Sequence, residues 1–413
     1  MKMTHQSPVR ARLARSVADN SGGKSAAFYD FHRRAVGGDR LTVAFMGGSL
    51  TWGSGATDPQ KTSYRALISR RLEQAYRKAH FTFVDAAIGG SGAQLGAFRL
   101  ERDVLAYQPN LFFLDFTLND NTYQTSPDTL AAYESIMHRM IAAGCPVVQM
   151  ILASRFDIEE GQLEKMVRRT AHLALARAYH TAVGDAITLI RRHCRGQTNR
   201  IDPLWPPERF DNTHPADAGY VLYAQAAWLA LQKAIAAKMV CRVPRQMCHG
   251  ERYQSINRVP IAALAQLPPG WHPAQPYTSS VAFDFMMSRW LDSLTVAANF
   301  LAEDRVKTRP APPAQPLRVG FHGSTVLVFG ESTPRSGKYR VVIDGVPGTE
   351  FDAGKLGRAA GGNGHLWEVL AEGLPIGEHS LEIQPIYEPS GIPAEVRLES
   401  ICVAGGEAKV WRL

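Results

Sequence analysis

The stretch LTVAFMGGSLTWG, residues 41–53, is the most informative part of the sequence for the fold. Its first half is an uncharged, mostly apolar run, which ends in two glycines and Ser49. A short apolar run bounded by glycines is typical of a strand that is buried on both faces. In open α/β sheets the ligand crevice lies at the carboxyl ends of such strands. The sequence therefore places Ser49 beside a crevice, on a tight turn that its small neighbours permit.

The same alternation of strand-like and helix-like segments continues to about residue 240. A short helix is expected near 26–34, and further strands are expected at 81–88, 111–116, 146–151 and 182–185. Helical periodicity covers 64–79, 95–106, 127–143, 163–179 and 216–238. Strands that alternate with helices of this length imply a parallel sheet covered on both faces. We therefore predict an α/β domain at residues 41–245, preceded by an N-terminal arm at 1–40.

The pattern changes after about residue 250. Long helical periodicity ends, and TRPAPPAQP, residues 308–316, forms a proline-rich connector or an extended loop. Short strands are expected at 317–321, 325–329, 338–343, 379–385 and 396–404, with turn signals such as Ser336-Gly337 and Asp344-Gly345 between them. Such a series predicts a β-sandwich. We place the boundary within 240–258, so that residues 246–413 form an accessory, jelly-roll-like β-sandwich domain.

Length and composition fit two globular domains. The chain has 413 residues, of which 45% are apolar and 20% charged. Its net charge of +8 has two interpretations: attraction to an acidic polymer, or basic residues spread over a solvated surface. The sequence contains no run of five or more Lys and Arg residues, which favours the second interpretation. We therefore expect no nucleic-acid partner.

The cysteines and the apolar segments indicate neither a disulfide framework nor a membrane span. The five cysteines form no CxxC pair, although Cys241 and Cys248 are close enough in sequence to pair locally. Cys248-His249 lacks the spacing of a zinc site, so no metal is expected. The first 25 residues have no apolar core typical of a secretory signal. The most apolar stretch, residues 219–240, contains glutamine and lysine and is interpreted as a packed helix. We expect a cytoplasmic protein without a membrane partner. Export of the protein stays open as an alternative, if a leader peptide is missing from the sequence.

A second glycine motif, IGGSG at residues 88–92, follows the next strand. The backbone N–H of a glycine at this position can face a developing oxyanion. A competing interpretation is a dinucleotide site, because Gly90, Gly92 and Gly96 stand between a strand and a helix and Asp115 could bind a ribose. Two features weigh against it. The spacing is not GxGxxG, and the strand would be the second rather than the first.

Two polar motifs complete the set. TLND, residues 117–120, follows an apolar run, and the Asn119 side chain can either donate to an oxyanion or form a turn. DNTHP, residues 211–215, precedes the last helix of the α/β region. A carboxylate three residues before a histidine can orient the imidazole, so that the other ring nitrogen acts as a general base. The alternative is that Asp211 merely caps the helix and His214 is an ordinary loop residue.

The order of the four motifs resembles the SGNH hydrolase family, the GDSL-like lipases and esterases, which is named for Ser, Gly, Asn and His in successive blocks. The blocks are GGSLTWG around Ser49, AAIGGSG around Gly90, TLND around Asn119, and DNTHP around Asp211 and His214. The resemblance covers residues 41–240. Gly48 stands where the GDSL pattern has aspartate, which puts a simple lipase label in doubt. The GxSxG elbow of α/β-hydrolases is absent, because Thr51 occupies its last position.

The resemblance implies a flavodoxin-like three-layer α/β/α fold and a serine esterase that needs no cofactor. His214 would take the proton from Ser49, while Asp211 would orient His214. The oxyanion would be held by the backbone N–H groups of Ser49 and Gly90 and by the side chain of Asn119. The neighbouring Gly89 leaves the second donor uncertain by one position.

The substrate is expected to be a short-chain ester. The sequence shows no long apolar lid before the catalytic block, which argues against a true lipase. The C-terminal domain resembles the sandwich modules found beside carbohydrate O-acetyl esterases, on the stretches LPPGW at 267–271 and VFGES at 328–332 through IDG at 343–345. This resemblance implies that the substrate is an O-acetylated carbohydrate, either a small molecule or an oligosaccharide.

Aromatic residues could contribute to such a site. Trp52 and Tyr123, close in sequence to Ser49 and Asn119, are predicted to line the substrate pocket. Trp271, Trp290 and Trp367 can either stack on sugar rings or fill the sandwich core, and the second is favoured. Two further functions stay open: a catalytically weak carbohydrate-binding protein, and an acyltransferase that uses the same serine.

Overall fold

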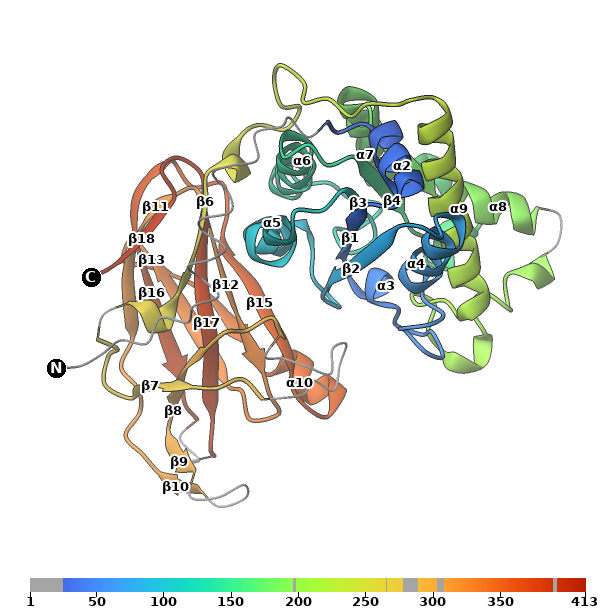
Figure 1. The fold of residues 1–413 in the computed structure, drawn as a ribbon. Helices are drawn as coiled ribbons and strands as arrows, with labels where there is room; N and C mark the ends of the chain where they lie inside the picture. The colour runs from blue at the N-terminus through green and yellow to red at the C-terminus, as the bar shows by residue number, and fades with distance from the viewer. Residues whose placement is uncertain (1–24, 196–197, 265, 278–288, 303–307, 389–391) are drawn as a thin grey trace.

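The computed structural model describes residues 25–195, 198–264, 266–277, 289–302, 308–388 and 392–413. It contains an α/β unit followed by an all-β unit, and the two lie side by side (Figure 1). The predicted fold class, a three-layer α/β/α unit followed by a β-sandwich, is confirmed. Residues 1–24 of the predicted arm lie outside the described residues.

A five-stranded parallel sheet forms the middle layer of the α/β unit. Its strands, in spatial order, are β2 (His80–Ala87), β1 (Arg40–Gly47), β3 (Leu111–Asp115), β4 (Val147–Ile151) and β5 (Ala182–Asp185). The strand order reverses between β1 and β3, so the loops that follow these two strands flank the crevice in which open α/β sheets bind ligands. Every residue of β3 and β4 is buried, as expected for strands covered on both faces.

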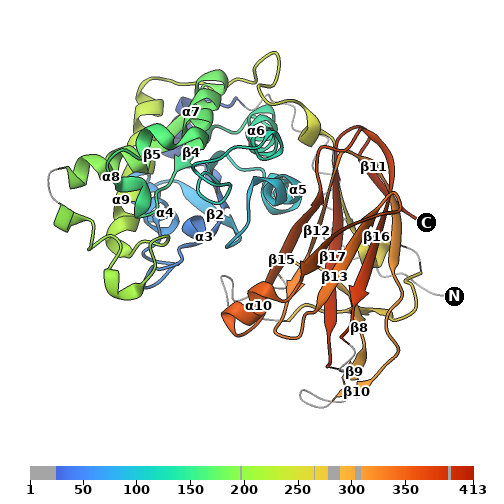
Figure 2. The same ribbon diagram turned by 180° about the vertical axis from the view of Figure 1, so that it is seen from behind.

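Helices cover both faces of this sheet (Figures 1 and 2). One face carries α2 (Phe28–Gly37), α4 (Tyr64–Ala75) and α9 (Asp217–Ala236), with α8 (Ala186–Cys194) packed beside α9. The other face carries α5 (Ala93–Asp103), α6 (Pro127–Ala142) and α7 (Val167–Tyr179). Serine caps set two helix starts, because Ser63 accepts from the N–H of Ala66 and Ser126 from that of Thr129.

Helix α2 belongs to the α/β unit, although the sequence placed it in an arm. Its Phe28 and Phe31 are buried in the same hydrophobic core as the strands of the parallel sheet. Within the described part of the chain, none of the helices is both long enough and apolar enough for a membrane crossing. All five cysteines are free, and Cys241 is buried whereas Cys248 is exposed, so the local pair does not form.

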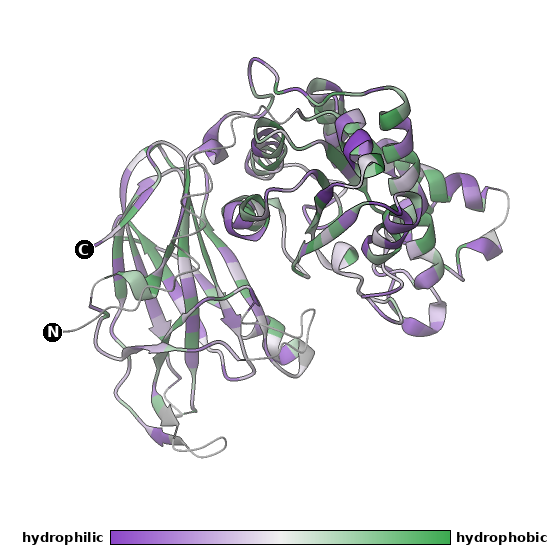
Figure 3. Ribbon diagram, in the orientation of Figure 1, coloured by the Kyte–Doolittle hydropathy of each residue, from purple (hydrophilic) through white to green (hydrophobic). Residues whose placement is uncertain are grey.

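The all-β unit consists mainly of two antiparallel sheets among the described residues. One has the order β14 (Val346–Asp352), β13 (Lys338–Ile343), β16 (Gly377–Ile386), β11 (Leu317–Gly323), β18 (Lys409–Arg412). The other has the order β15 (Gly364–Ala371), β12 (Thr325–Ser332), β17 (Glu395–Ala404), β8 (Leu294–Ala298), β7 (Trp271–Ala274), and β6 (Ile256–Pro260) also pairs with β17. Apolar residues occur along the strands of both sheets (Figure 3), and buried residues of the two sheets share one hydrophobic core, which is the arrangement of a sandwich.

Smaller elements complete this unit. The strands β9 (Phe300–Ala302) and β10 (Thr308–Pro310) form a short antiparallel pair, and α10 (Lys355–Ala360) precedes β15. The predicted turn at Asp344-Gly345 joins β13 to β14, and both residues have positive φ, 52° and 76°. Two residues in this conformation are typical of the type I′ turn of a two-residue hairpin.

The six-stranded sheet packs on the α5 side of the α/β unit (Figures 1 and 2). The side chain of Gln94, on α5, donates to the hydroxyl of Tyr253 and to Glu372, both at 3.0 Å. The buried Asp128, on α6, accepts from Thr325 at 3.0 Å and forms an ion pair with Arg252 at 2.5 Å. The start of α5 therefore lies close to the sandwich, and this contact brings the sandwich next to the motif at residues 88–92.

Candidate active site

The nucleophile candidate lies on a very short helix directly after β1. Ser49 is the first residue of α3 (Ser49–Trp52), and Gly53, with φ 107°, ends this helix. The first N–H groups of a helix have no acceptor within the helix, so the N–H of Ser49 is available to a ligand. The buried Arg65 donates to the carbonyl oxygens of Thr51 at 3.4 Å and Trp52 at 3.2 Å, and these bonds fix the end of the helix.

The loop before α9 is held by its own aspartate. Asp211 Oδ1 accepts the backbone N–H groups of Thr213 at 2.9 Å and His214 at 3.0 Å, in a turn typical of Asx residues. The backbone N–H of Arg155, from the loop after β4, donates to the carbonyl oxygen of Asn212 at 2.8 Å. The loop is thus fixed both locally and against the end of the parallel sheet.

Ser49, His214 and Asp211 form one hydrogen-bonded relay. His214 Nδ1 lies 2.8 Å from Asp211 Oδ2, and His214 Nε2 lies 2.8 Å from Ser49 Oγ. Partial burial alone would raise the pKa of Asp211, but the hydrogen bonds and the charge of His214 outweigh it and lower this pKa. A carboxylate that stays ionised beside Nδ1 can orient the imidazole and stabilise its cation, which leaves Nε2 to exchange a proton with Ser49.

Asn119 lies against the nucleophile turn. A Cβ atom at Gly48 would come 2.2 Å from Oδ1 and 2.6 Å from Nδ2 of Asn119. The Asn119 amide therefore occupies the space beside Gly48, one residue before Ser49, where a larger residue would collide with it. An aspartate at position 48, the residue of the GDSL pattern, would require the Asn119 amide to move.

Gly90 lies at the tip of a tight turn. The N–H and the hydroxyl of Ser91 both donate to the carbonyl oxygen of Ile88, at 3.2 and 2.7 Å. Gly90 has φ 74°, which suits the third position of a type II turn and strongly favours glycine. It is exposed whereas Gly89 is buried, so the geometry supports Gly90 rather than its neighbour as the residue that faces a substrate.

The dinucleotide interpretation does not fit the site. Asp115, which was considered as the ribose-binding acid, is completely buried, and its Oδ2 accepts from the hydroxyl of Thr51 at 3.4 Å. Burial raises the pKa of Asp115 to about 7. A carboxylate enclosed under the nucleophile helix cannot reach a ribose.

The aromatic candidates differ in their surroundings. Trp52 is the last residue of α3 and is partly buried, as is Tyr123, whose hydroxyl donates to the buried Asp157 at 2.8 Å. Their role as pocket residues stays a prediction. Trp271 is buried in the sandwich core, and its indole N–H donates to the carbonyl oxygen of Gln315 at 2.7 Å.

Trp290 and Trp367 both lie between the two units. Trp290 is buried, and the guanidinium groups of Arg99 and Arg289 lie over its ring at 5.2 and 4.4 Å. Trp367, on β15, donates its indole N–H to the carbonyl oxygen of Gly90 at 3.0 Å. No sequence pattern predicts this contact, because it joins residues that are far apart in the chain.

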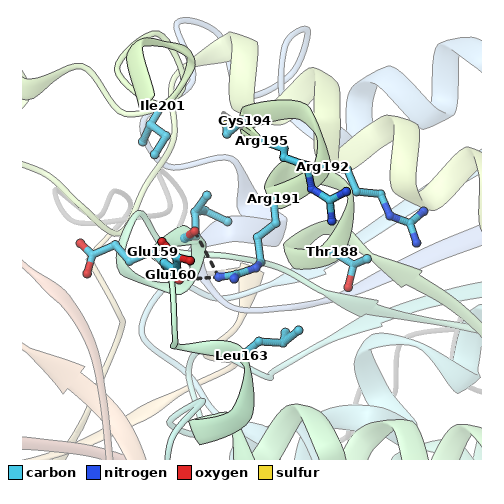
Figure 4. Close-up of a pocket in the computed structure, with 10 residues that line it drawn as sticks. Glu159, Glu160, Leu163, Thr188, Arg191, Arg192, Cys194, Arg195 and Ile201 are labelled. Carbon is cyan, nitrogen blue, oxygen red and sulfur yellow. Dashed lines mark hydrogen bonds between the residues drawn. The ribbon is translucent and has the colours of Figure 1, made fainter. Parts of the chain in front are cut away.

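A separate cavity of about 720 Å³ opens elsewhere on the α/β unit (Figure 4). Three arginines on and just after α8 line it, and Arg191 donates to the carbonyl oxygens of Ile158 and Glu159. None of its lining residues belongs to the four motifs. Among the described residues, no group of three or more His, Cys, Asp or Glu side chains is arranged to hold a metal ion.

Comparison with known proteins identifies the α/β unit. Residues 45–222 match the GDSL-like Lipase/Acylhydrolase family. No curated protein matches the sequence. Among solved structures, a two-domain esterase active on acetylated mannans, co-crystallised with mannopentaose, is 18% identical, has a TM-score of 0.68 and covers 92% of this chain and 95% of its own. A second structure of a two-domain esterase active on acetylated mannans has a TM-score of 0.62 with the same identity and coverage.

A third structure, a catalytic mutant of an acetylxylan esterase from Geobacillus stearothermophilus, is 19% identical, has a TM-score of 0.38 and covers 46% of this chain and 94% of its own. The two mannan-esterase structures show that the two-unit fold is shared over nearly the whole chain. The family match covers residues 45–222, within the α/β unit, and supports a carboxylic ester hydrolase.

Proposed function

We propose that the protein removes O-acetyl groups from a carbohydrate through an acyl-enzyme on Ser49. The observation that carries the proposal is the continuous relay in which His214 lies 2.8 Å from Asp211 on one side and 2.8 Å from Ser49 on the other. In this arrangement His214 accepts the proton of the Ser49 hydroxyl as its oxygen attacks the acyl carbon, and later returns it to the leaving alcohol. Water, deprotonated by His214, then releases acetate and restores Ser49.

Three donors would stabilise the tetrahedral oxyanion: the backbone N–H groups of Ser49 and Gly90 and the side-chain amide of Asn119. The position of Ser49 at the start of α3, the exposed turn at Gly90 and the packing of Asn119 against Gly48 support these roles. Donors that are already fixed lose little free energy to reorganisation when charge develops on the oxygen.

The carbohydrate part of the proposal draws on the two-unit architecture. Esterases active on acetylated mannans share this architecture over both units. In this chain the sandwich reaches the turn at Gly90 through Trp367, so a substrate bound at Ser49 would lie near both units. An acetyl group on a sugar hydroxyl fits a site that is bordered by a second domain.

The test compares wild type with Ser49→Ala on acetylated manno-oligosaccharides, acetylated xylo-oligosaccharides and p-nitrophenyl acetate, butyrate and octanoate. We expect acetate release from an acetylated oligosaccharide, a preference for acetate among the p-nitrophenyl esters, and loss of at least about a thousandfold in kcat/KM in the variant. Ser54→Ala is the matched control, because the hydrogen bonds of Ser54 within the described part of the chain use its backbone: its N–H donates to the carbonyl oxygen of Ser49 at 3.0 Å, and its carbonyl oxygen accepts from the hydroxyl of Tyr220 at 2.6 Å.

The outcomes separate the possible functions. A preference for octanoate would reject the acetyl assignment. Acetyl transfer to an added sugar in place of hydrolysis would identify an acyltransferase. Oligosaccharide binding without ester cleavage would indicate a carbohydrate-binding protein.

A further inference from the structure

We propose that Asp120 is a positioning residue that holds the Asn119 loop and the Gly90 turn in one fixed arrangement. The proposal rests on the proposed function, because it assigns Asp120 through the two oxyanion donors that this function uses. Asp120 directly follows Asn119, but the relay of Ser49, His214 and Asp211 makes no use of it.

The side chain of Asp120 joins the two loops. Its Oδ1 accepts the backbone N–H of Ala93 at 3.0 Å, and Ala93 is the first residue of α5, just after the turn that carries Gly90. Its own backbone N–H donates to the carbonyl oxygen of Phe116 at 2.9 Å, at the end of β3. One residue is thus bound to the end of β3 through its backbone and to the start of α5 through its carboxylate.

The fit around this contact is close. A Cβ atom at Gly92 would come 2.4 Å from Asp120 Oδ1 and 3.4 Å from the ring of Trp367. Gly92 has φ −111°, which any residue can adopt, so the space and not the backbone conformation favours glycine here. Gly92 therefore gives the carboxylate access to the start of α5.

Arg168 faces Asp120 from the other side, without a hydrogen bond between the two side chains. Arg168 Nη1 lies 4.0 Å from Asp120 Oδ2, and the two side chains are only 2% and 4% exposed. The Nε of Arg168 donates to the carbonyl oxygens of Asn121 at 2.9 Å and Gln124 at 3.1 Å, so the same arginine fixes the chain that follows Asp120. Burial raises the pKa of Asp120 to about 7, partly offset by the charge of Arg168.

This geometry predicts how the effects of substitutions at Asn119 and Asp120 combine. If Asp120 acts on the reaction mainly by holding the Asn119 amide in place against the Gly90 turn, most of the kcat that its removal costs is lost only while that amide is present. Substitutions at Asn119 and Asp120 should then be strongly non-additive, as expected for residues that act as one unit. A residue that serves only the stability of the fold has no reason to show this coupling.

The experiment measures kcat and KM with p-nitrophenyl acetate for wild type, Asn119→Ala, Asp120→Ala and the double variant. We expect Asn119→Ala to lower kcat by about 10²–10³-fold, the usual cost of one oxyanion donor. Asp120→Ala should lower kcat by roughly 10- to 100-fold and change KM by less than about threefold, and the double variant should fall within about threefold of Asn119→Ala alone. Asp120→Asn, which keeps an oxygen to accept from Ala93, should recover most of the lost kcat.

Asp103→Ala is the matched control, because Asp103 is a buried carboxylate on α5 that pairs with Arg99 at 2.6 Å, away from both loops. It should lower Tm while kcat stays within about threefold of wild type. If Asp120→Ala does not fold, Gly92→Ala is used in its place, because the added methyl group displaces the Asp120 carboxylate from the start of α5. This variant should show the same non-additivity with Asn119→Ala.

Effects that multiply in the double variant would overturn the proposal, as would an equal loss of kcat in Asp103→Ala. A loss below about threefold in Asn119→Ala would reject the oxyanion role of Asn119, and with it this part of the proposed function. A large loss in Asn119→Ala together with multiplying effects would reject the role of Asp120 alone.

Discussion

The loops at the carboxyl ends of the parallel strands and the strands of the sandwich use their side chains in different ways. In the loops, glycines leave space for polar groups, and the Asn119 amide fills the space beside Gly48. In the sandwich, Trp271 is buried and its indole N–H is satisfied within the same unit. Trp367 is different, because its indole donates to Gly90 in the other unit. The four motifs thus lie on the α/β unit, and the sandwich contacts one of them at Gly90.

The largest expected effect lies within the loops. Asp211→Asn keeps the shape of the side chain but favours the wrong tautomer of His214, so kcat with p-nitrophenyl acetate should fall by about three to four orders of magnitude. Asn212→Ala, a change at an exposed neighbouring residue, is the control and should stay within about threefold of wild type. A loss of less than about tenfold in Asp211→Asn would argue against the relay.

The packing of Asn119 beside Gly48 can be broken directly. Gly48→Asp restores the GDSL residue, but its Cβ would meet the Asn119 amide at 2.2 Å, so the amide must move. We expect kcat to fall roughly 10- to 100-fold, part of the cost of losing one oxyanion donor. Gly37→Ala is a matched control, since a Cβ there meets no atom closer than 3.9 Å. Unchanged or higher kcat in Gly48→Asp would show that Asn119 does not depend on this space.

Two tryptophans of the sandwich, Trp367 and Trp271, test whether a sandwich residue that contacts Gly90 affects catalysis more than one buried within the sandwich. Trp367→Phe removes the hydrogen bond to Gly90 and should lower kcat by about three- to tenfold, because the turn loses one support. Trp271→Phe removes an equivalent hydrogen bond inside the sandwich and should lower Tm by about 2–4 °C with kcat unchanged. Steady-state kinetics and thermal unfolding of both variants measure these effects. Equal losses of kcat in the two variants would contradict a specific role for the contact between Trp367 and Gly90.

A smaller effect is expected on the stability of the fold, through Asp115, which is buried under α3. Burial raises the pKa of Asp115 from 3.8 to about 7. Between these values the folded state binds a proton that the unfolded state has released, so the contribution of Asp115 to stability falls as the pH rises through this window. Asp115→Asn keeps an oxygen that can accept from Thr51 but does not titrate. The difference in Tm between this variant and wild type should therefore be about 2–4 °C more favourable to the variant at pH 8 than at pH 5. No difference between the two pH values would show that Asp115 does not titrate there.

Much of the α/β unit could be predicted because its strands are short apolar runs that end in glycine or polar residues. The predicted strand at 182–185 coincides with β5, and the predicted strand at 81–88 differs from β2 by one residue at each end. Helix α8 escaped prediction because Asp185 both ends β5 and caps the next helix, accepting from the N–H of Thr188 at 3.0 Å. No turn signal separates the two elements.

The sandwich was harder to predict, since its strands mix apolar and polar residues. Strand β15 contains His365, Trp367 and Glu368, and β14 is largely exposed, so neither has the clear alternation that predicts a strand. In the site, the four motifs could be predicted from their order along the chain. The contacts of Gly48 with Asn119 and of Gly90 with Trp367 could not, because they exist only once distant segments have packed together.

The proposal that Ser49 carries the acyl group during turnover is tested most directly by detecting the acyl-enzyme. Protein mixed with p-nitrophenyl acetate is quenched in acid within the first turnovers, digested and analysed by mass spectrometry. We expect a mass increase of one acetyl group on the peptide that contains Ser49, and no such increase on the corresponding peptide of Ser49→Ala. Acetylation of a different residue, or turnover that continues in Ser49→Ala, would contradict the proposal.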